Sequence, residues 1–251
     1  MIVVKNKLAL DKMRTAGKKL AEIVEGRLPE QVVKGVTTLE LDRFVEEKMI
    51  ESGLYPVCKG YAGYKHATCV SLNDVVIHGV PSDKIVLKSG DFVKIDVAGS
   101  YKGYCADMTR YFFVGEVDVK VKKLAATAQF ALDTAISKIA PGVHLSDISA
   151  AVQEVVERDG FGVVRKFAGH GIGKNLHEDP EIPNFGKSGQ GPVLREGMTF
   201  AIEPMITIGS YEVKTAIDGW SIKTVDGSWA AHVEDTVAVT KNGAQVLTRL
   251  E

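Results

Sequence analysis

The sequence lacks the features that mark secreted, membrane-spanning and nucleic-acid-binding proteins. It has only three cysteines, Cys58, Cys69 and Cys105, an odd and unpatterned set that suits reduced thiols better than a disulfide framework. No segment approaches the ~18 apolar residues of a membrane span, and the start has no apolar run long enough for a signal peptide. The formal net charge of −1 gives no electrostatic basis for tight nucleic-acid binding. We therefore expect a cytoplasmic protein that binds neither DNA nor a membrane.

What the sequence does contain is the composition of an ordinary globular protein. The chain has 251 residues, of which 45% are hydrophobic and 25% charged. This length can bury a full core, either as one large domain or as two fused halves.

Hydrophobic periodicity predicts four helices, over residues 8–28, 37–53, 121–140 and 145–160. Thr37 and Glu40 have the spacing of a capping box at the start of the second helix. β-Branched and aromatic residues predict strands over 67–79 and a hairpin over 91–115. The chain from residue 161 onward is expected to be strand and loop.

This order of elements repeats within the chain. Gly35-Val36 and the helix after it are matched 107 residues later by Gly142-Val143 and a second helix. At the same offset LKSGDFVKID (87–96) falls on LREGMTFAIE (194–203), which aligns Asp96 with Glu203. After about twenty extra residues in the second half, Asp107 aligns with Glu234, and a threonine follows each acid two positions later. Four acids thus form two pairs related by the repeat.

These acids need a source of positive charge. Asp96 and Glu203 sit in or beside apolar strands, where an unpaired charge costs several kcal/mol. The nearest basic residues, Lys94 and Arg110, cannot supply four partners. If the two halves face each other, the four acids converge and repel one another unless cations lie between them. Two divalent metal ions would meet this requirement.

A histidine in an unusual stretch adds to this set. FAGHGIGKNLHEDPEIP (167–183) places His170 between Gly169 and Gly171, glycines that let backbone or a ligand come close. One imidazole with four carboxylates suits Mn²⁺, Fe²⁺, Co²⁺ or Zn²⁺. Two such ions about 3.5 to 4 Å apart are a known hydrolytic device.

Several motifs together resemble the type I methionine aminopeptidases. They are GHGIG and HEDP within 169–180, EPM at 203–205, ATCVSLNDVVIHGVP at 67–81, and DGW at 218–220 before AHVEDT. The resemblance covers nearly the whole chain. It implies an α+β, two-halved "pita-bread" fold, in which two pairs of helices cover a curved antiparallel sheet. It also implies a single catalytic domain of residues 1–251, with pseudo-repeat halves of about 1–118 and 119–251.

The resemblance also implies roles for individual residues. Asp96 would be a two-oxygen ligand of one metal ion, Asp107 and Glu234 would bridge, and His170 and Glu203 would bind the other ion. His78, His177 and Glu203 would be catalytic. The substrate pocket would comprise Cys58, Tyr61, Tyr64, Cys69, His78, Leu176, His177 and Trp220. In some members a monovalent cation binds backbone at the positions of Asn73, Val75 and Ala230.

The implied activity is metal-dependent hydrolysis that removes N-terminal methionine when the second residue is small. Substrates would be peptide or nascent-chain N-termini, and transient ribosome association is left open. We expect a monomer.

Two alternatives come from the same fold. The sequences CADMTRYF around Asp107 and VEDT around Glu234 resemble those of Xaa-Pro peptidases more than those of methionine aminopeptidases. Those relatives usually have a histidine where this chain has Lys166 and an arginine where it has His232. A non-catalytic binding protein is the other alternative, but such proteins lose metal ligands and this chain keeps all five. An oxygen-activating di-iron site expects Glu-x-x-His on bundle helices, whereas these acids are on predicted strands.

Overall fold

Four α-helices lie in two pairs in a computed structural model that describes residues 1–250. They are α1 (Lys7–Val24), α2 (Thr38–Glu51), α3 (Val119–Ser137) and α4 (Leu145–Arg158). All four predicted helices are therefore present. Thr37 and Glu40 form the predicted capping box at the start of α2. Short 3₁₀ turns at Leu28–Glu30 and Tyr61–Gly63 were not predicted.

Strands make up one large and two small sheets in residues 1–250. The large sheet has nine strands in the order β1-β4-β5-β14-β9-β7-β8, with β2 paired to β4 and β15 to β14, and its pairings are antiparallel. The small sheets are β13-β10-β6 and β11-β12-β3. The strands span β1 (Tyr55–Pro56), β2 (Thr68–Leu72), β3 (Val75–Ile77), β4 (Phe92–Tyr101), β5 (Tyr104–Phe113), β6 (Gly162–Val163), β7 (Ala168–Gly171), β8 (Glu178–Pro183), β9 (Thr199–Ile202), β10 (Met205–Thr207), β11 (Val213–Thr215), β12 (Ile222–Thr224), β13 (Ala230–His232), β14 (Glu234–Thr240) and β15 (Gly243–Val246).

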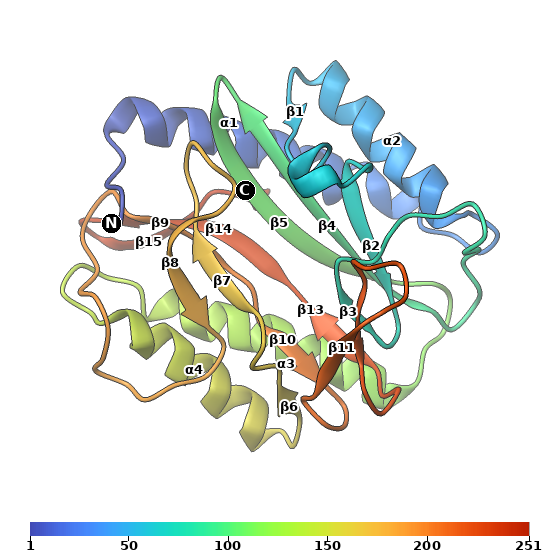
Figure 1. The fold of residues 1–251 in the computed structure, drawn as a ribbon. Helices are drawn as coiled ribbons and strands as arrows, with labels where there is room; N and C mark the ends of the chain where they lie inside the picture. The colour runs from blue at the N-terminus through green and yellow to red at the C-terminus, as the bar shows by residue number, and fades with distance from the viewer. Residues whose placement is uncertain (251) are drawn as a thin grey trace.

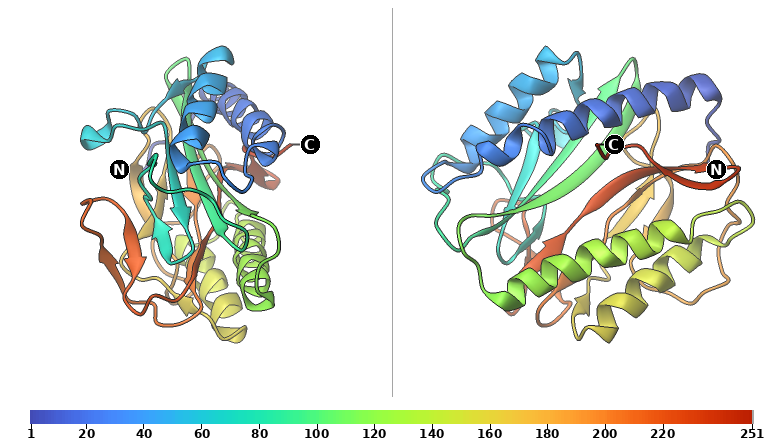
Figure 2. Two further views of the ribbon diagram at one scale, coloured as in Figure 1. Left: turned by 90° about the vertical axis from the view of Figure 1, so that its right-hand side faces the viewer. Right: turned by 180° about the vertical axis from the view of Figure 1, so that it is seen from behind.

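The helices cover one side of the large sheet (Figures 1 and 2). Seen from behind, α1 and α3 lie in front of the long strands, while β7, β8 and β11 lie on the far side. One core cluster packs α1 and α2 on β4 and β5, and a second packs α3 and α4 on β9 and β14. No helix in the described residues is long and apolar enough to span a membrane.

Backbone hydrogen bonds recur at the offset found in the sequence. Gly35 N–H donates to the Leu87 carbonyl at 2.9 Å, and Gly142 N–H donates to the Leu194 carbonyl at 3.0 Å. Gly142 lies 107 positions after Gly35, and Leu194 lies 107 positions after Leu87, so the two hydrogen bonds are equivalent in the repeat. The two halves meet where β5 pairs with β14, in the middle of the sheet. The fold is thus the α+β, pseudo-symmetric arrangement expected from the sequence.

Candidate metal centre

The acids of the repeat lie on the sheet face that the helices leave open. Asp96 in β4 lies between Ile95 and Val97, which both belong to the core beneath α1 and α2. Because successive strand residues point to opposite faces, Asp96 points away from the helices. Asp107 in β5 also alternates with core residues, and Glu234 begins the adjacent β14. The pairing of β4, β5 and β14 therefore brings three of the four acids together.

His170 in β7 and Glu203, just after β9, complete the group. His170 Nε2 lies 3.6 Å from Glu203 Oε1 and 3.9 Å from Asp107 Oδ2. Its Nδ1 lies 2.9 Å from the Gly171 carbonyl oxygen. A carbonyl can only accept, so Nδ1 carries the proton and Nε2 presents its lone pair to the carboxylates.

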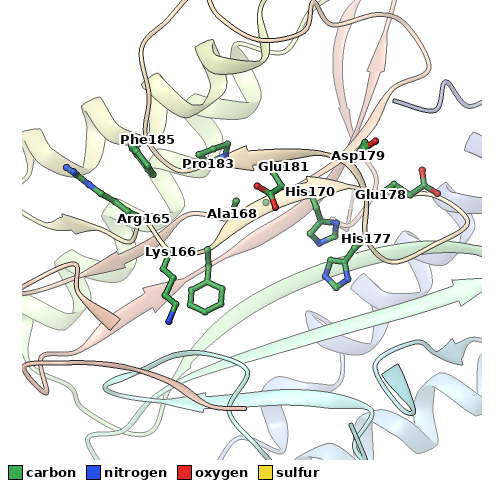
Figure 3. Close-up of a pocket in the computed structure, with 12 residues that line it drawn as sticks. Arg165, Lys166, Ala168, His170, His177, Glu178, Asp179, Glu181, Pro183 and Phe185 are labelled. Carbon is green, nitrogen blue, oxygen red and sulfur yellow. The ribbon is translucent and has the colours of Figure 1, made fainter. Parts of the chain in front are cut away.

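Close strand packing explains the glycines beside His170. A Cβ atom on Gly171 would lie 2.1 Å from the Asp179 carbonyl oxygen, and one on Gly169 would lie 2.5 Å from the Ala201 carbonyl oxygen. The sequence prediction that backbone comes close here is confirmed. Figure 3 shows the side chains of His170 and His177 next to each other, and their ring centroids are 4.4 Å apart.

The acids are buried without the partners that a carboxylate needs. Asp107 Oδ1 and Glu234 Oε1 are buried and make no hydrogen bond among residues 1–250. Burial, together with the Asp107 charge, raises the pKa of Asp96, Glu203 and Glu234 well above the usual range. Burial raises the pKa of Asp107 to about 6. Positive charge is therefore needed on this face of the sheet.

The basic residues nearest in sequence do not provide that charge. Arg110 binds the carboxylates of Glu25 and Asp235, each at 2.7 Å. Lys94 Nζ donates to the Asn73 carbonyl at 3.0 Å. The prediction that neither residue neutralises the four acids is confirmed.

The two threonines of the repeat, Thr109 and Thr236, form hydrogen bonds to Glu234 and Asp107, respectively. Thr109 Oγ1 donates to Glu234 Oε2 at 3.1 Å. Thr236 Oγ1 accepts from the Asp107 N–H and donates to the Asp107 carbonyl, both at 2.8 Å. Each threonine thus contacts the acid-bearing residue of the other half.

The donor set fits divalent metal ions. Asp107, His170 and Glu234 each offer one ligand atom, and these three atoms lie within 4.8 Å of one another. Buried carboxylate oxygens without partners and an imidazole lone pair suit hard or borderline ions. The residues present therefore match a metal site built from the acids and His170.

A cavity of about 130 Å³ adjoins the acids. Asp96 and Asp107 line it together with all the residues expected in the substrate pocket, which are Cys58, Tyr61, Tyr64, Cys69, His78, Leu176, His177 and Trp220. The ring centroids of Tyr64 and Trp220 are 5.0 Å apart. Burial raises the pKa of the Cys58 and Cys69 thiols, so both thiols are uncharged at neutral pH.

The two other expected histidines reach the same cavity. His177 Nδ1 lies 2.9 Å from the Tyr61 hydroxyl, and burial lowers the pKa of His177. His78 has φ +58°, a left-handed conformation that non-glycine residues adopt mainly at constrained sites. Burial and the His177 charge lower the pKa of His78 to about 4. Both rings are therefore neutral near pH 7.

Sequence reasoning missed His232 as a site residue. Its Nε2 lies 3.4 Å from Glu203 Oε2 and makes no hydrogen bond in the described part of the chain. Burial and the charges of His78 and Lys94 lower its pKa to about 3. Its position two residues before Glu234 was the available signal, because residues two apart on an extended chain share a face.

Of the backbone expected to bind a monovalent cation, the Asn73 carbonyl is already hydrogen-bonded. The Asn73 carbonyl accepts from Lys94 Nζ and from the Ala230 N–H, both at 3.0 Å. A carbonyl oxygen has two lone pairs, so both acceptor sites are used. These residues do not fit a bound monovalent cation at Asn73.

Comparison with known proteins shows the family. The model of metallopeptidase family M24 matches residues 11–241. The chain belongs to this family. It is 43% identical to a methionine aminopeptidase of Clostridium acetobutylicum over the full length of both chains. It is 41% identical to the methionine aminopeptidase of Escherichia coli, covering 98% of this chain and 94% of the relative.

Solved structures agree with this assignment. The crystal structure of a Thermotoga maritima methionine aminopeptidase has a TM-score of 0.98 and 44% identity, with full coverage of both chains. A prolidase from Pyrococcus furiosus has a TM-score of 0.80 and 26% identity, and this chain covers 66% of it. The resemblance to the methionine aminopeptidases and the pita-bread fold are therefore confirmed. Figure 3 shows Lys166, where Xaa-Pro peptidases usually have a histidine, apart from His170 and His177.

Proposed function

We propose that this M24 enzyme removes N-terminal methionine by hydrolysis from peptides and nascent chains whose second residue is small. One observation carries the proposal: a single cavity, lined by apolar and aromatic side chains, has Asp96 and Asp107 in its wall. A substrate side chain in this cavity places its own backbone beside the acids. The relatives named as methionine aminopeptidases support the same activity.

We propose that Asp96, Asp107, His170, Glu203 and Glu234 hold two divalent ions, drawn from Mn²⁺, Fe²⁺, Co²⁺ and Zn²⁺. The partnerless oxygens of Asp107 and Glu234 support this role. Ions bound there would supply an activated water molecule and polarise the scissile carbonyl.

The protein's own side chains would orient the substrate and move protons. Asp96 lines the methionine cavity, so its carboxylate is placed to attract the free α-ammonium group. Glu203 lies between His170 and His232, and we assign to it the proton taken from water and passed to the leaving amine.

His177 and His78 would act on the peptide bond itself. If the Tyr61 hydroxyl donates to His177 Nδ1, the proton of His177 resides on Nε2, which can donate to the oxygen of the scissile carbonyl. His78 lines the same cavity and would contact the leaving nitrogen. Because burial keeps both rings neutral, each can donate without adding positive charge beside the metal ligands.

The cavity explains a preference for methionine. Its aromatic, leucine and neutral thiol walls can hold an unbranched thioether. A charged or amide side chain would lose its hydrogen bonds to water there, at a cost of about 1 to 3 kcal/mol or more.

The test is a peptide panel assayed after reconstitution with each candidate ion, and metal content measured on the same samples. Met-Ala-Ser should be cleaved with much higher kcat/KM than Leu-Ala-Ser, Met-Lys-Ser or Ala-Pro. An Xaa-Pro peptidase would instead require proline at position two and tolerate many residues at position one. Equal turnover of Ala-Pro and Met-Ala-Ser would contradict the assigned specificity, and binding without turnover would favour a non-catalytic protein.

A further inference from the structure

Lys94 is a fully buried lysine in the middle of the sheet. It lies in β4 two residues before Asp96, with 1% of its surface exposed. Its Nζ donates to the Asn73 carbonyl at 3.0 Å and lies 5.0 Å from the centre of the Phe92 ring. It forms no ion pair within residues 1–250, and the nearby Asp74 carboxylate is bound by Lys223 at 2.9 Å. Such burial without a carboxylate partner is costly and calls for a specific role.

The Asn73 carbonyl joins the two halves of the protein. Asn73 forms the turn between β2 and β3 in a left-handed conformation, with φ +51°. Its side chain accepts from the Phe92 N–H at 2.9 Å and donates to Asp91 at 3.0 Å, which ties the turn to the start of β4. Its carbonyl accepts from the Ala230 N–H at the start of β13, the strand that contains His232. Lys94 therefore binds the oxygen that connects the first half to the strand leading to Glu234.

We propose that the Lys94 ammonium group is a tethered internal cation that takes the place of a dissociable monovalent ion at the Asn73 carbonyl. Electrostatics favour this reading because a free cation at that oxygen would lie close to an ammonium group and find no remaining lone pair. A covalently attached cation also loses no translational freedom on binding, so the turn is held at any salt composition. Lys94 is thus a positioning residue that acts through Asn73 and Ala230.

If Lys94 fills this role, the thermal stability of the protein should not depend on alkali ions, and replacing Lys94 should make it depend on them. Lys94→Asn removes the ammonium group, frees one lone pair of the Asn73 carbonyl and adds an amide oxygen as a further ligand. The variant should therefore bind sodium or potassium ions where the wild type does not. Lys223→Asn is the matched control, because Lys223 in β12 binds Asp74 of the same turn, so the substitution removes a nearby positive charge without freeing the Asn73 carbonyl.

The experiment measures Tm on the protein freed of divalent metal, in equal concentrations of potassium, sodium or tetramethylammonium chloride. Wild type and Lys223→Asn should have the same Tm in the three salts. Lys94→Asn should have a lower Tm in tetramethylammonium chloride and recover several degrees in potassium or sodium. The sodium NMR line should broaden with this variant alone, a signal that does not depend on peptidase activity.

Two results would overturn the proposal. One is a wild type stabilised by an alkali ion relative to tetramethylammonium. The other is a folded Lys94→Asn variant that gains neither alkali stabilisation nor sodium line broadening. If Lys94→Asn folds in none of the salts, the same comparison on Lys94→Gln decides, since its longer amide fills more of the space. Folding of either variant only when potassium or sodium is present would support the proposal.

Discussion

Two neighbouring acids in β14 lie in different environments. Glu234 points to the open face, and its Oε1 has no hydrogen-bond partner in the described residues. Asp235 points to the other face, where Arg110 binds it at 2.7 Å and Arg249 at 2.6 Å. Strand alternation alone separates the two environments. The sequence pattern identified Glu234 by its counterpart in the repeat, whereas nothing in the spacing revealed the arginines of Asp235.

His170 and His177 lie side by side but should respond differently to removal. His170→Ala removes a proposed metal ligand, so metal content should fall and activity should drop below about a tenth of wild type. His177→Ala should keep its metal and lose about 10² to 10³ in kcat, because only charge developing during attack loses a donor. Metal analysis and steady-state kinetics on both variants check this. Loss of metal from His177→Ala would make His177 a ligand.

At the scale of elements, the N-terminal segment fastens the loop that carries His177. Lys5 is buried and pairs with Glu178 at 2.7 Å, directly after His177. Lys5 Nζ also donates to the Val3 carbonyl at 3.0 Å, and the Lys5 N–H donates to the Gly197 carbonyl at 2.7 Å. This pair joins the first residues of the chain to the start of β8, directly after His177, a proposed catalytic residue.

Lys5→Met should therefore weaken both stability and catalysis. It leaves the Glu178 carboxylate with 10% of its side chain exposed and no partner ammonium, which costs about 3 to 5 kcal/mol when a buried pair is broken. Urea unfolding measures this change, and kcat should fall because the loop bearing His177 loosens. Lys7→Met is the control, since Lys7 is exposed and should change stability by less than about 0.5 kcal/mol. Equal stability of the two variants would show that the ion pair contributes little.

The elements also show which features a sequence can predict. Helix positions and the repeat followed from periodicity and spacing, because these are local signals that survive folding. The bond from Lys94 to Asn73 and the contact of His232 with Glu203 join residues 21 and 29 positions apart. Such contacts depend on how strands are paired and where a turn reaches, and periodicity carries no information on either. The 3₁₀ turn at Tyr61–Gly63 was missed for a different reason, because its Ala62 has φ +45°, a left-handed conformation that is uncommon for residues other than glycine.

At the scale of the molecule, metal removal should lower the Tm. Without ions, four buried carboxylates remain close together, whereas an ion present at 100 times its Kd adds about 2.7 kcal/mol to the free energy of unfolding. For a chain of this size that is roughly 5 to 10 °C. Thermal unfolding with a chelator, and again after adding back manganese or cobalt, measures the shift. Glu234→Gln is the control and should show a much smaller difference, because a proposed ligand is already lost. An unchanged wild-type Tm would contradict the metal site.

The cluster on the back of the sheet has a consequence for how this sequence can diverge. Losing Asp235 alone leaves Arg110 with only Glu25 and Arg249 with only Asp133 as carboxylate partners, and losing an arginine alone leaves the buried Asp235 carboxylate short of charge. Replacing all three with apolar residues of similar volume could be nearly neutral, yet each single step towards that state is strongly unfavourable. Single substitutions at these three positions should therefore be selected against. Asp235, Arg110 and Arg249 should be inherited together or exchanged together.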